Sequence, residues 1–593
     1  MVFADIGTSI YYVPGILYGQ YGSRAAIFVL MTLFVFVLLT VKYAEVAWRY
    51  PEGGGVVTVA SRALHPFAGL LGGLFIIVDY YLTAALSALS GVFYLAAVVP
   101  SLYSLAVPLS MAALVGLGIL NWLGIRESAR VSLIFAVAAG AGQLLVLVAV
   151  MIAIGPAGFV RAIQQLGHGP ALTAPLLITG YAAAFLAFSG LESIAQVAPA
   201  MREPRRVVAG RAMFAVVASM AITSPLLTLF STTLLSPRAD PNQFISILGA
   251  QVAGQWLGNY VAVSGALLLI FASNTAIIGG YHVFVALARM GFLPRPVEDR
   301  NRWRHTPHWA ILLAVAVPVA LVQVSAGSPA LLGDLYAFGL LGAFCLTCLG
   351  LDIVRWHDRK ARTTLLQHAG FGLGVLTTIA VIVAWCVNLV QKPLATEFGG
   401  GLTLIGLVIG FGSYWYYRQR QPSVFPLPYR PNRPIVYLLA GMRMQPAEVM
   451  VILPHDHEVA ASLLHATAEA AHGRPVVFVY RGDYFPEGAE EFLEVVDPYL
   501  KDYHARDAFA RAERFGRQRG IRDRRYIYVP GNLPAAAMAD VWRQIHPRET
   551  IVIDGEQQVL PPIAIDRIRR QPVEGATILH LVSRKDVVAP ISA

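Results

Sequence analysis

The chain has 593 residues, of which 56% are hydrophobic and only 13% are charged. Soluble domains carry roughly 25% charged residues, so a soluble globule is excluded. The formal net charge of +10 belongs to the first 420 residues, which hold 24 Lys and Arg against 14 Asp and Glu, whereas the last 173 hold 21 of each kind. Because this excess lies in the apolar part, a basic tail that binds nucleic acid is excluded as well.

Apolar runs long enough to cross about 30 Å of hydrocarbon recur through the first part of the chain. We predict about twelve transmembrane helices, and hence a multi-pass protein of the cell membrane whose surroundings are the lipid bilayer. The runs lie at residues 1–19, 24–47, 67–98, 103–123, 130–154, 173–198, 210–235, 258–288, 308–326, 331–354, 369–390 and 400–418.

The distribution of basic residues predicts the orientation, because basic loops stay on the cytoplasmic side. Twenty of the 24 Lys and Arg fall in alternate loops, starting with Lys42, Arg49 and Arg62 after the second run. Only four lie in the intervening loops. We therefore expect both termini in the cytoplasm.

The C-terminal part has a different pattern. Residues 421–434 are Pro-rich and polar, which predicts an extended linker. Short apolar runs at 447–454, 475–482, 525–531, 549–555 and 576–584 then alternate with helical patterns, as in a parallel sheet with crossover helices. We divide the chain into a transmembrane domain at 1–420, a linker at 421–434 and a cytoplasmic α/β domain at 435–593.

Three acidic residues, Asp5, Asp79 and Glu192, lie inside predicted spans, where a charge facing lipid is costly. The alternative to a functional role is an interhelical ion pair. We expect no Lys or Arg within the spans near these acids, so we favour function.

The first span is expected to be broken near the middle of the bilayer. Gly7 and Thr8 follow Asp5, and Pro14 and Gly15 close the stretch. Broken helices free carbonyl oxygens, from which many transporters build ion sites. A Gly-Pro kink that only packs is the alternative. The polar residues around the predicted break are Asp5, Thr8, Ser9, Tyr11 and Tyr12.

The third span carries a polar stripe. Asp79, Thr83 and Ser87 follow each other at intervals of four residues and share one helical face, with Tyr80 next to Asp79. Hydroxyls also serve as contacts between membrane helices, so packing remains open for Thr83 and Ser87.

The sixth span contains Ser189, Gly190, Glu192 and Ser193 and resembles a second interrupted helix. If spans one to five and six to ten are inverted repeats, the first and sixth correspond, and paired irregular helices point to a binding site. Tyr336 could close this site from outside, unless it is a tyrosine of the membrane interface.

The motif DIGTSIYY at residues 5–12 resembles the opening motif of the KUP potassium-uptake family, within the amino acid-polyamine-organocation (APC) superfamily. The likeness is strongest to KimA-type potassium/proton symporters. It implies a LeuT-like 5+5 inverted repeat, the APC fold, and a tail that resembles universal stress proteins. It implies cation-coordinating or gating roles for Asp5, Tyr12, Asp79, Tyr80, Thr83, Ser87, Ser189, Glu192 and Tyr336.

Two departures from the family pattern are visible. Ser189 stands where this branch has Thr, which keeps a hydroxyl. A half-helix precedes the break in this superfamily, whereas only Met1 to Ala4 precede Asp5, so we expect the true N-terminus to lie upstream of Met1. The resemblance further implies that the tail dimerises and binds a cyclic dinucleotide.

The buried acids favour a cation over the carboxylate of an amino acid, and hard monovalent cations take oxygen ligands. We expect secondary active potassium uptake, with the coupled proton on Glu192 or Asp5. Ser273, Asn274 and Thr275 are candidate sodium ligands, although helix packing is favoured for them. Two alternatives stay open: an amino acid or polyamine permease whose substrate amine pairs with Asp5, and a membrane receptor whose tail signals.

The sequence contains no HExxH, nucleophile elbow or phosphate-binding glycine loop. We therefore expect neither an enzyme nor a bound cofactor, apart from the dinucleotide that the resemblance implies.

Overall fold

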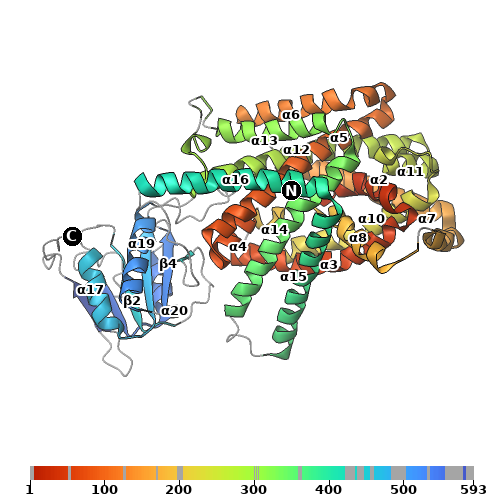
Figure 1. Cartoon of the computed structure of the whole chain (residues 1–593). Helices are drawn as coiled ribbons and strands as arrows, with labels where there is room; N and C mark the ends of the chain where they lie inside the picture. The colour runs from red at the N-terminus through yellow and green to blue at the C-terminus, as the bar shows by residue number, and fades with distance from the viewer. Residues whose placement is uncertain are drawn as a thin grey trace.

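The computed structural model describes residues 6–50, 55–124, 129–168, 171–196, 205–299, 301, 303–304, 306–357, 364–420, 434–436, 446–454, 460–482, 503–521, 523–530, 535–553 and 578–582. Figure 1 shows long helices packed side by side in the N-terminal part and a sheet flanked by helices in the C-terminal part.

Each of the twelve predicted spans contains a helix. These are α2 (Ser9–Tyr21), α3 (Ala25–Arg49), α5 (Pro66–Val98), α6 (Ala106–Trp122), α7 (Ala129–Gln165), α8 (Ala174–Ala183), α10 (Arg205–Leu234), α12 (Gln255–Arg289), α13 (His308–Val324), α14 (Pro329–His357), α15 (Leu365–Gln391) and α16 (Pro393–Arg420).

By length and apolar composition, however, the described residues contain ten candidate spans rather than twelve. The segment Ser9–Ala47 counts once, because the short turn η1 (Gly22–Arg24) follows α2 directly and leads directly into α3. The helix α13 has 17 residues and falls among the shorter apolar helices.

The hydropathy pattern does not predict several short elements as separate helices. These include α4 (Gly55–Ala63), α11 (Phe244–Ala253), η2 (Pro100–Leu105) and η6 (Pro241–Gln243). The prediction that Pro14 and Gly15 close the first stretch is wrong, because α2 continues through Pro14 to Tyr21. Gly15 instead makes room for η6: a Cβ at this position would overlap the carbonyl oxygen of Pro241.

The helix α5 is the centre of the bundle, since 94% of its most apolar stretch is buried, against 22% for α6 and α16. It packs against α12 and α14. The contact with α14 is close because glycine faces the α5 backbone: a Cβ at Gly339 would lie 2.6 Å from Phe75 O and 2.7 Å from Asp79 N. The residues on α5 are therefore held by main-chain contact with α14.

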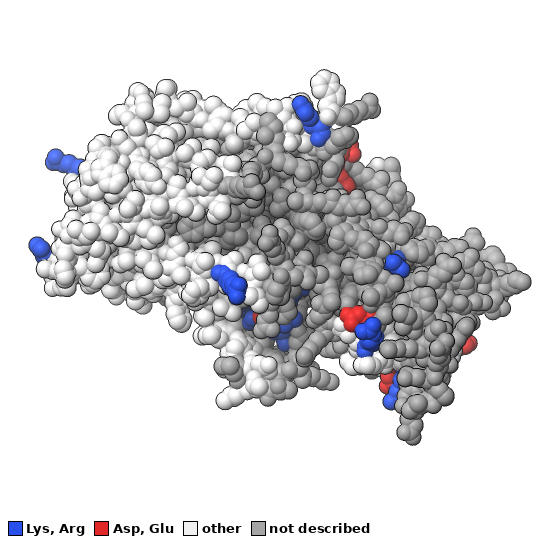
Figure 2. Space-filling model, turned by 180° about the vertical axis from the view of Figure 1, so that it is seen from behind, with Lys and Arg blue, Asp and Glu red and all other residues white. Residues whose placement is uncertain are grey.

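The outer helices present apolar side chains to their surroundings. Exposed residues include Leu133 and Ile152 on α7, Leu376 on α15 and Val408 on α16. Figure 2 shows a broad face on which the described residues are almost all uncharged, with Lys and Arg mostly near its margins. Such a surface fits a lipid environment, and the chain is a multi-pass membrane protein.

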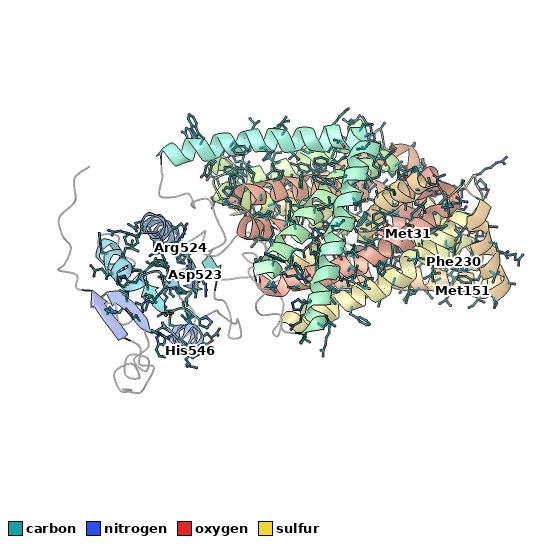
Figure 3. The ribbon with its side chains drawn as sticks, turned by 60° about the horizontal axis from the view of Figure 1, so that its bottom comes forward. Met31, Met151, Phe230, Asp523, Arg524 and His546 are labelled. Atoms are coloured by element: carbon teal, nitrogen blue, oxygen red, sulfur yellow. The ribbon has the colours of Figure 1, made fainter. Side chains whose placement is uncertain are left out.

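The helices α7 and α10 contact each other through aromatic side chains. Figure 3 labels Phe230 of α10, whose ring is fully buried and meets Phe159 of α7 at 6.1 Å between ring centres. Met31 and Met151, labelled in the same view, are partly exposed on α3 and α7.

The C-terminal part forms a six-stranded, fully parallel sheet in the order β1-β4-β3-β2-β5-β6. All five predicted strands are present, and β1 is additional and begins at the last residue of the predicted linker. The strands are β1 (Pro434–Val436), β2 (Val449–Ile452), β3 (Val476–Gly482), β4 (Arg524–Pro530), β5 (Glu549–Ile553) and β6 (Ile578–Val582).

The described helices of this part are α17 (Ala460–Ala471), α19 (Tyr503–Gln518) and α20 (Ala535–Ile545). Arg524, labelled in Figure 3 at the start of β4, reaches back to α19 and holds Glu513 with two hydrogen bonds of 2.7 and 2.6 Å. The Tyr526 hydroxyl donates a third, at 2.5 Å. Burial, followed by the charge of Glu513, raises the pKa of Tyr526 above its usual value.

Candidate functional site

The first helix break lies at residues 7 and 8, directly before α2. The Gly7 carbonyl oxygen is reached by the side-chain amide of Gln143, at 3.4 Å, from the middle of α7. Thr8, the N-cap of α2, is buried with no capping bond from its side chain. Asp5 lies outside the described residues. The break is thus present where the sequence predicts it, and polar side chains surround it.

The second break interrupts the sixth span. The helix α8 tightens into η4 (Ala184–Phe188), Ser189 is extended, Gly190 has a φ of +92°, and α9 (Ser193–Gln196) resumes the helix. The last carbonyl groups of η4 have no continuing helix to bond to, and the C-terminal end of a helix carries partial negative charge. This arrangement suits a cation.

One side chain joins the two breaks. Ser9 Oγ lies 2.8 Å from Ile6 O at the first break and 2.7 Å from Ala187 O at the second. All of these atoms are buried. Two interrupted segments that are 178 residues apart in sequence therefore meet at a single hydroxyl.

The polar stripe on α5 meets Tyr336 of α14. The Thr83 and Tyr336 hydroxyls lie 2.5 Å apart, and both residues are buried. Ser87, one turn further along α5, is fully buried, and among the described residues its hydroxyl has no hydrogen-bond partner. Tyr336 is only 1% exposed, so the alternative of an interfacial tyrosine is wrong.

Two of the three candidate acids, Asp79 and Glu192, are described by the structure and lie close to this hydroxyl pair. Asp79, Tyr12 and Glu192 are all near enough to Tyr336 to act on it electrostatically. Asp79 is fully buried on α5, and Glu192 is 3% exposed just after the second break. The fold therefore brings together Tyr12, Asp79, Thr83, Glu192 and Tyr336 from four separate stretches of the chain.

Other candidates lie elsewhere. The ring of Tyr80 packs on α12, where a Cβ at Gly279 would come within 2.8 Å of it. Tyr11 packs edge-on against Tyr94, at 5.1 Å between ring centres. Ser273 Oγ lies 3.1 Å from Ala84 O, and Asn274 accepts a 2.6 Å bond from Asn121, which is helix packing as favoured.

The sequence argument missed two buried polar residues next to the site. Gln143, whose amide reaches the first break, is a lone polar residue in an apolar run. Tyr43 of α3 is fully buried and lies within electrostatic range of both Glu192 and Asp79. A search for single polar residues in the middle of apolar runs would have found Gln143.

The assumption that basic residues stay in loops is wrong for Lys42. This residue lies within α3 and is only 2% exposed. Its ammonium group bonds to Asp352 of α14, at 2.8 Å. Lys42 thus lies within the second predicted span, but the acid it pairs with is Asp352 and none of the three acids singled out from the sequence.

A family model described as amino acid permease matches residues 1–411. The chain belongs to this family. The matched region contains both helix breaks, α5, α14 and every site residue named above.

Individual relatives of the chain are named as potassium transporters or as a putrescine importer. It is 27% identical to "Potassium transporter KimA" of Bacillus subtilis (strain 168), over 61% of this chain and 60% of that protein, so the match spans about three fifths of the relative's length. It is 26% identical to "Probable potassium transport system protein Kup" of Pseudomonas paraeruginosa, over 79% and 74%. It is 22% identical to "Low-affinity putrescine importer PlaP" of Escherichia coli (strain K12), over 61% and 81%.

Proposed function

We propose that the chain is a secondary active transporter that takes up potassium in symport with protons. The observation that carries this proposal is the cluster of Asp79, Glu192, Tyr12, Thr83 and Tyr336 between two helix breaks. Its polar groups are carboxylates, hydroxyls and freed carbonyls, which are the oxygen ligands that a desolvated monovalent cation needs. The names of two relatives, KimA and Kup, support potassium as the cation.

The ligands would be Asp5, Thr8, Tyr12, Asp79, Thr83, Ser87, Ser189, Glu192 and Tyr336, with Tyr80 at their edge. Glu192 and Asp5 would exchange the coupled proton, because a carboxyl group next to a departing cation loses its counter-charge. The two breaks support the 5+5 inverted repeat, since they occur in the first and sixth spans, which would be equivalent.

Uptake of rubidium, as a tracer for potassium, tests the proposal in a strain that lacks its own potassium uptake. Proteoliposomes with and without a pH gradient then test the proton coupling. We expect uptake to require the gradient and to be lost in Glu192→Gln. The control is Glu397→Gln, a carboxylate on α16, which should transport like the parent. Equal uptake by Glu192→Gln and the parent would reject the site.

The second candidate is a polyamine or amino acid permease, favoured by the relative named as a putrescine importer. An ammonium group would then bind where we place potassium. Labelled putrescine in the same vesicles separates the two: saturable putrescine uptake that rubidium does not support would replace the potassium proposal.

The location of the termini and the role of the tail extend the proposal. Both termini would lie in the cytoplasm of a plasma-membrane protein, which a reporter fused after residue 593 would test. The tail at 435–593, following the linker at 421–434, would be a dimerising regulatory domain of the universal-stress-protein type. In its parallel sheet the chain adds β3 and β4 on one side of β2 and β5 and β6 on the other, and ligands bind at such switch points in the strand order.

A cyclic dinucleotide is the ligand that we propose for the switch point between β2 and β5. Calorimetric titration of the purified full chain with cyclic dinucleotides should show saturable heat, whereas the matching mononucleotide should not. Flat traces for both would remove the ligand from the proposal and leave the transport function unaffected.

A further inference from the structure

A second group of charged side chains is buried in the helix bundle, away from the candidate cation site. Lys42 Nζ of α3 lies 2.8 Å from both carboxylate oxygens of Asp352 on α14. It also lies 2.6 Å from Thr378 Oγ1 of α15 and 3.4 Å from Cys348 O. A single ammonium group therefore holds three helices together.

A second layer of ion pairs continues this group toward the ends of α3 and α14. Glu45 Oε1 accepts a 2.6 Å bond from Arg49, and its Oε2 accepts a 2.5 Å bond from Arg355. On α15, Gly374 leaves the space that the cations occupy: a Cβ there would overlap the Arg355 guanidinium and lie 3.3 Å from Lys42 Cε. Figure 1 shows α14 and α15 lying side by side along this stretch.

The position of Lys42 and Asp352 along the helices places them between the candidate site and these ends. Gly339 of α14 lies at the level of Asp79. Asp352 is thirteen residues further on, or about 20 Å along a helix. Tyr43, next to Lys42, fills part of the interval: its ring lies 5.5 Å from that of Phe344 between centres, and Glu192 and Asp79 are within electrostatic range of it. The helix α14, which carries Tyr336 of the site, is thus joined to α3 beyond the site by an ion pair.

Stability alone gives little reason to bury this pair. Desolvating two charges is costly, and replacing a buried ion pair by apolar residues of similar volume is often neutral or stabilising. A contact that must form and break repeatedly is different, because both charges regain water when the helices separate. An ion pair therefore suits a closure that opens in every cycle better than an apolar seal does.

We propose that Lys42 and Asp352 close the candidate site toward the end of the bundle that carries Arg49 and Arg355, and that this pair breaks whenever the site opens in that direction. The role in the cycle rests on the proposed transport function. The closure itself is a property of the fold and is measured without potassium.

Cys348 is a natural reporter for this closure, because it is fully buried and its carbonyl group lies at Lys42. The variant Cys345→Ala with Cys386→Ala keeps it as the single thiol. Its labelling by a small water-soluble methanethiosulfonate is measured in open membrane fragments, with and without Asp352→Asn. We expect Asp352→Asn to speed labelling about tenfold, because losing the pair shifts the population toward the open state.

Two further variants decide the interpretation. The exchanged pair Lys42→Asp with Asp352→Lys should return labelling close to the parent rate. Asp334→Asn, which breaks the ion pair with Lys392 elsewhere on α14, should leave the rate unchanged. Unchanged labelling in Asp352→Asn, or equal acceleration in Asp334→Asn, would overturn the closure.

A covalent cross-link tests the proposal if the variant Asp352→Asn does not fold. Lys42→Cys with Asp352→Cys, in a background without the native cysteines, is bridged by a short bifunctional thiol reagent. We expect the bridge to stop rubidium uptake, and uptake at the unbridged rate would refute the closure. If the unbridged protein takes up no rubidium while Cys348 labelling behaves as expected, the transport proposal fails and the closure stands.

Discussion

Asp79 and Asp352 are both buried carboxylates, on two helices that pack against each other, yet their surroundings differ. Asp352 is held by the Lys42 ammonium, the Thr378 hydroxyl and, more distantly, Arg355. Asp79 lies close to the hydroxyl pair of Tyr336 and Thr83. The same functional group thus holds a tethered cation in one place and lies beside a pair of hydroxyls in the other, where we place the mobile cation.

The largest effect is expected where α14 supports the candidate site. Gly339→Ala places a methyl group 2.6 Å from Phe75 O, and main-chain atoms cannot move aside without separating the helices. We expect loss of rubidium uptake and a destabilisation of about 1–3 kcal/mol, measured by thermal unfolding in detergent. The matched control is Gly372→Ala on α15, where nothing lies within 4 Å. Normal uptake by Gly339→Ala would show that this contact does not position Asp79.

The second prediction concerns the carboxylate that we assign to the mobile cation. Asp79→Asn keeps the shape but removes the charge, so rubidium uptake at low concentration should fall roughly tenfold to hundredfold. Thermal stability should change little, because Asn keeps the size and shape of the side chain. A large loss of stability with normal uptake would indicate that Asp79 has the same structural role as Asp352.

The third prediction concerns the hydroxyl pair. Tyr336→Phe removes one partner of the 2.5 Å contact with Thr83, and we expect a rise in the half-saturating rubidium concentration of about fivefold. Thr83→Val should have a similar effect, and the double variant should be no worse than the more affected single one. Additive losses would show that the two hydroxyls act on the cation separately.

The smallest effect is expected in the sheet, where Glu513 is paired with Arg524 as Asp352 is with Lys42. Tyr526 has a raised pKa because of burial and the nearby Glu513. Above about pH 10 the unfolded chain loses this proton before the folded chain does, so stability falls as the pH rises further. Tyr526→Phe should remove part of this fall, by about 1 kcal/mol or less, as measured by urea unfolding at pH 9 and pH 10.5. The same pH dependence of stability in the parent and in Tyr526→Phe would contradict this role of Tyr526.

Hydropathy and local residue patterns predict much of this structure but not its contacts between distant segments. The apolar runs predict the membrane helices, and the alternating pattern predicts β2 to β6, because both depend on near neighbours in sequence. The break after residue 6 and the one at Gly190 also follow from local glycine and polar residues. The burial of Lys42 does not, because its partner Asp352 lies 310 residues away.

The same limit applies to individual site residues. The four-residue spacing places Asp79, Thr83 and Ser87 on one face, and the structure keeps this stripe next to Tyr336. Tyr80 follows Asp79 by one residue, so its ring points to another side of α5 than the polar stripe and packs against Gly279. This contact depends on how α12 packs on α5. Pro14 was expected to close the first stretch, yet α2 continues through it to Tyr21, because a single proline inside a helix removes one hydrogen bond without ending the helix.

The Ser9 hydroxyl carries one hydrogen atom, although two carbonyl oxygens lie within hydrogen-bond distance of it. At any moment it can donate to Ile6 or to Ala187, but not to both. The oxygen that does not receive this hydrogen atom keeps a lone pair for another donor or for a cation. A rotation of a single hydroxyl is enough to choose which helix break offers that oxygen.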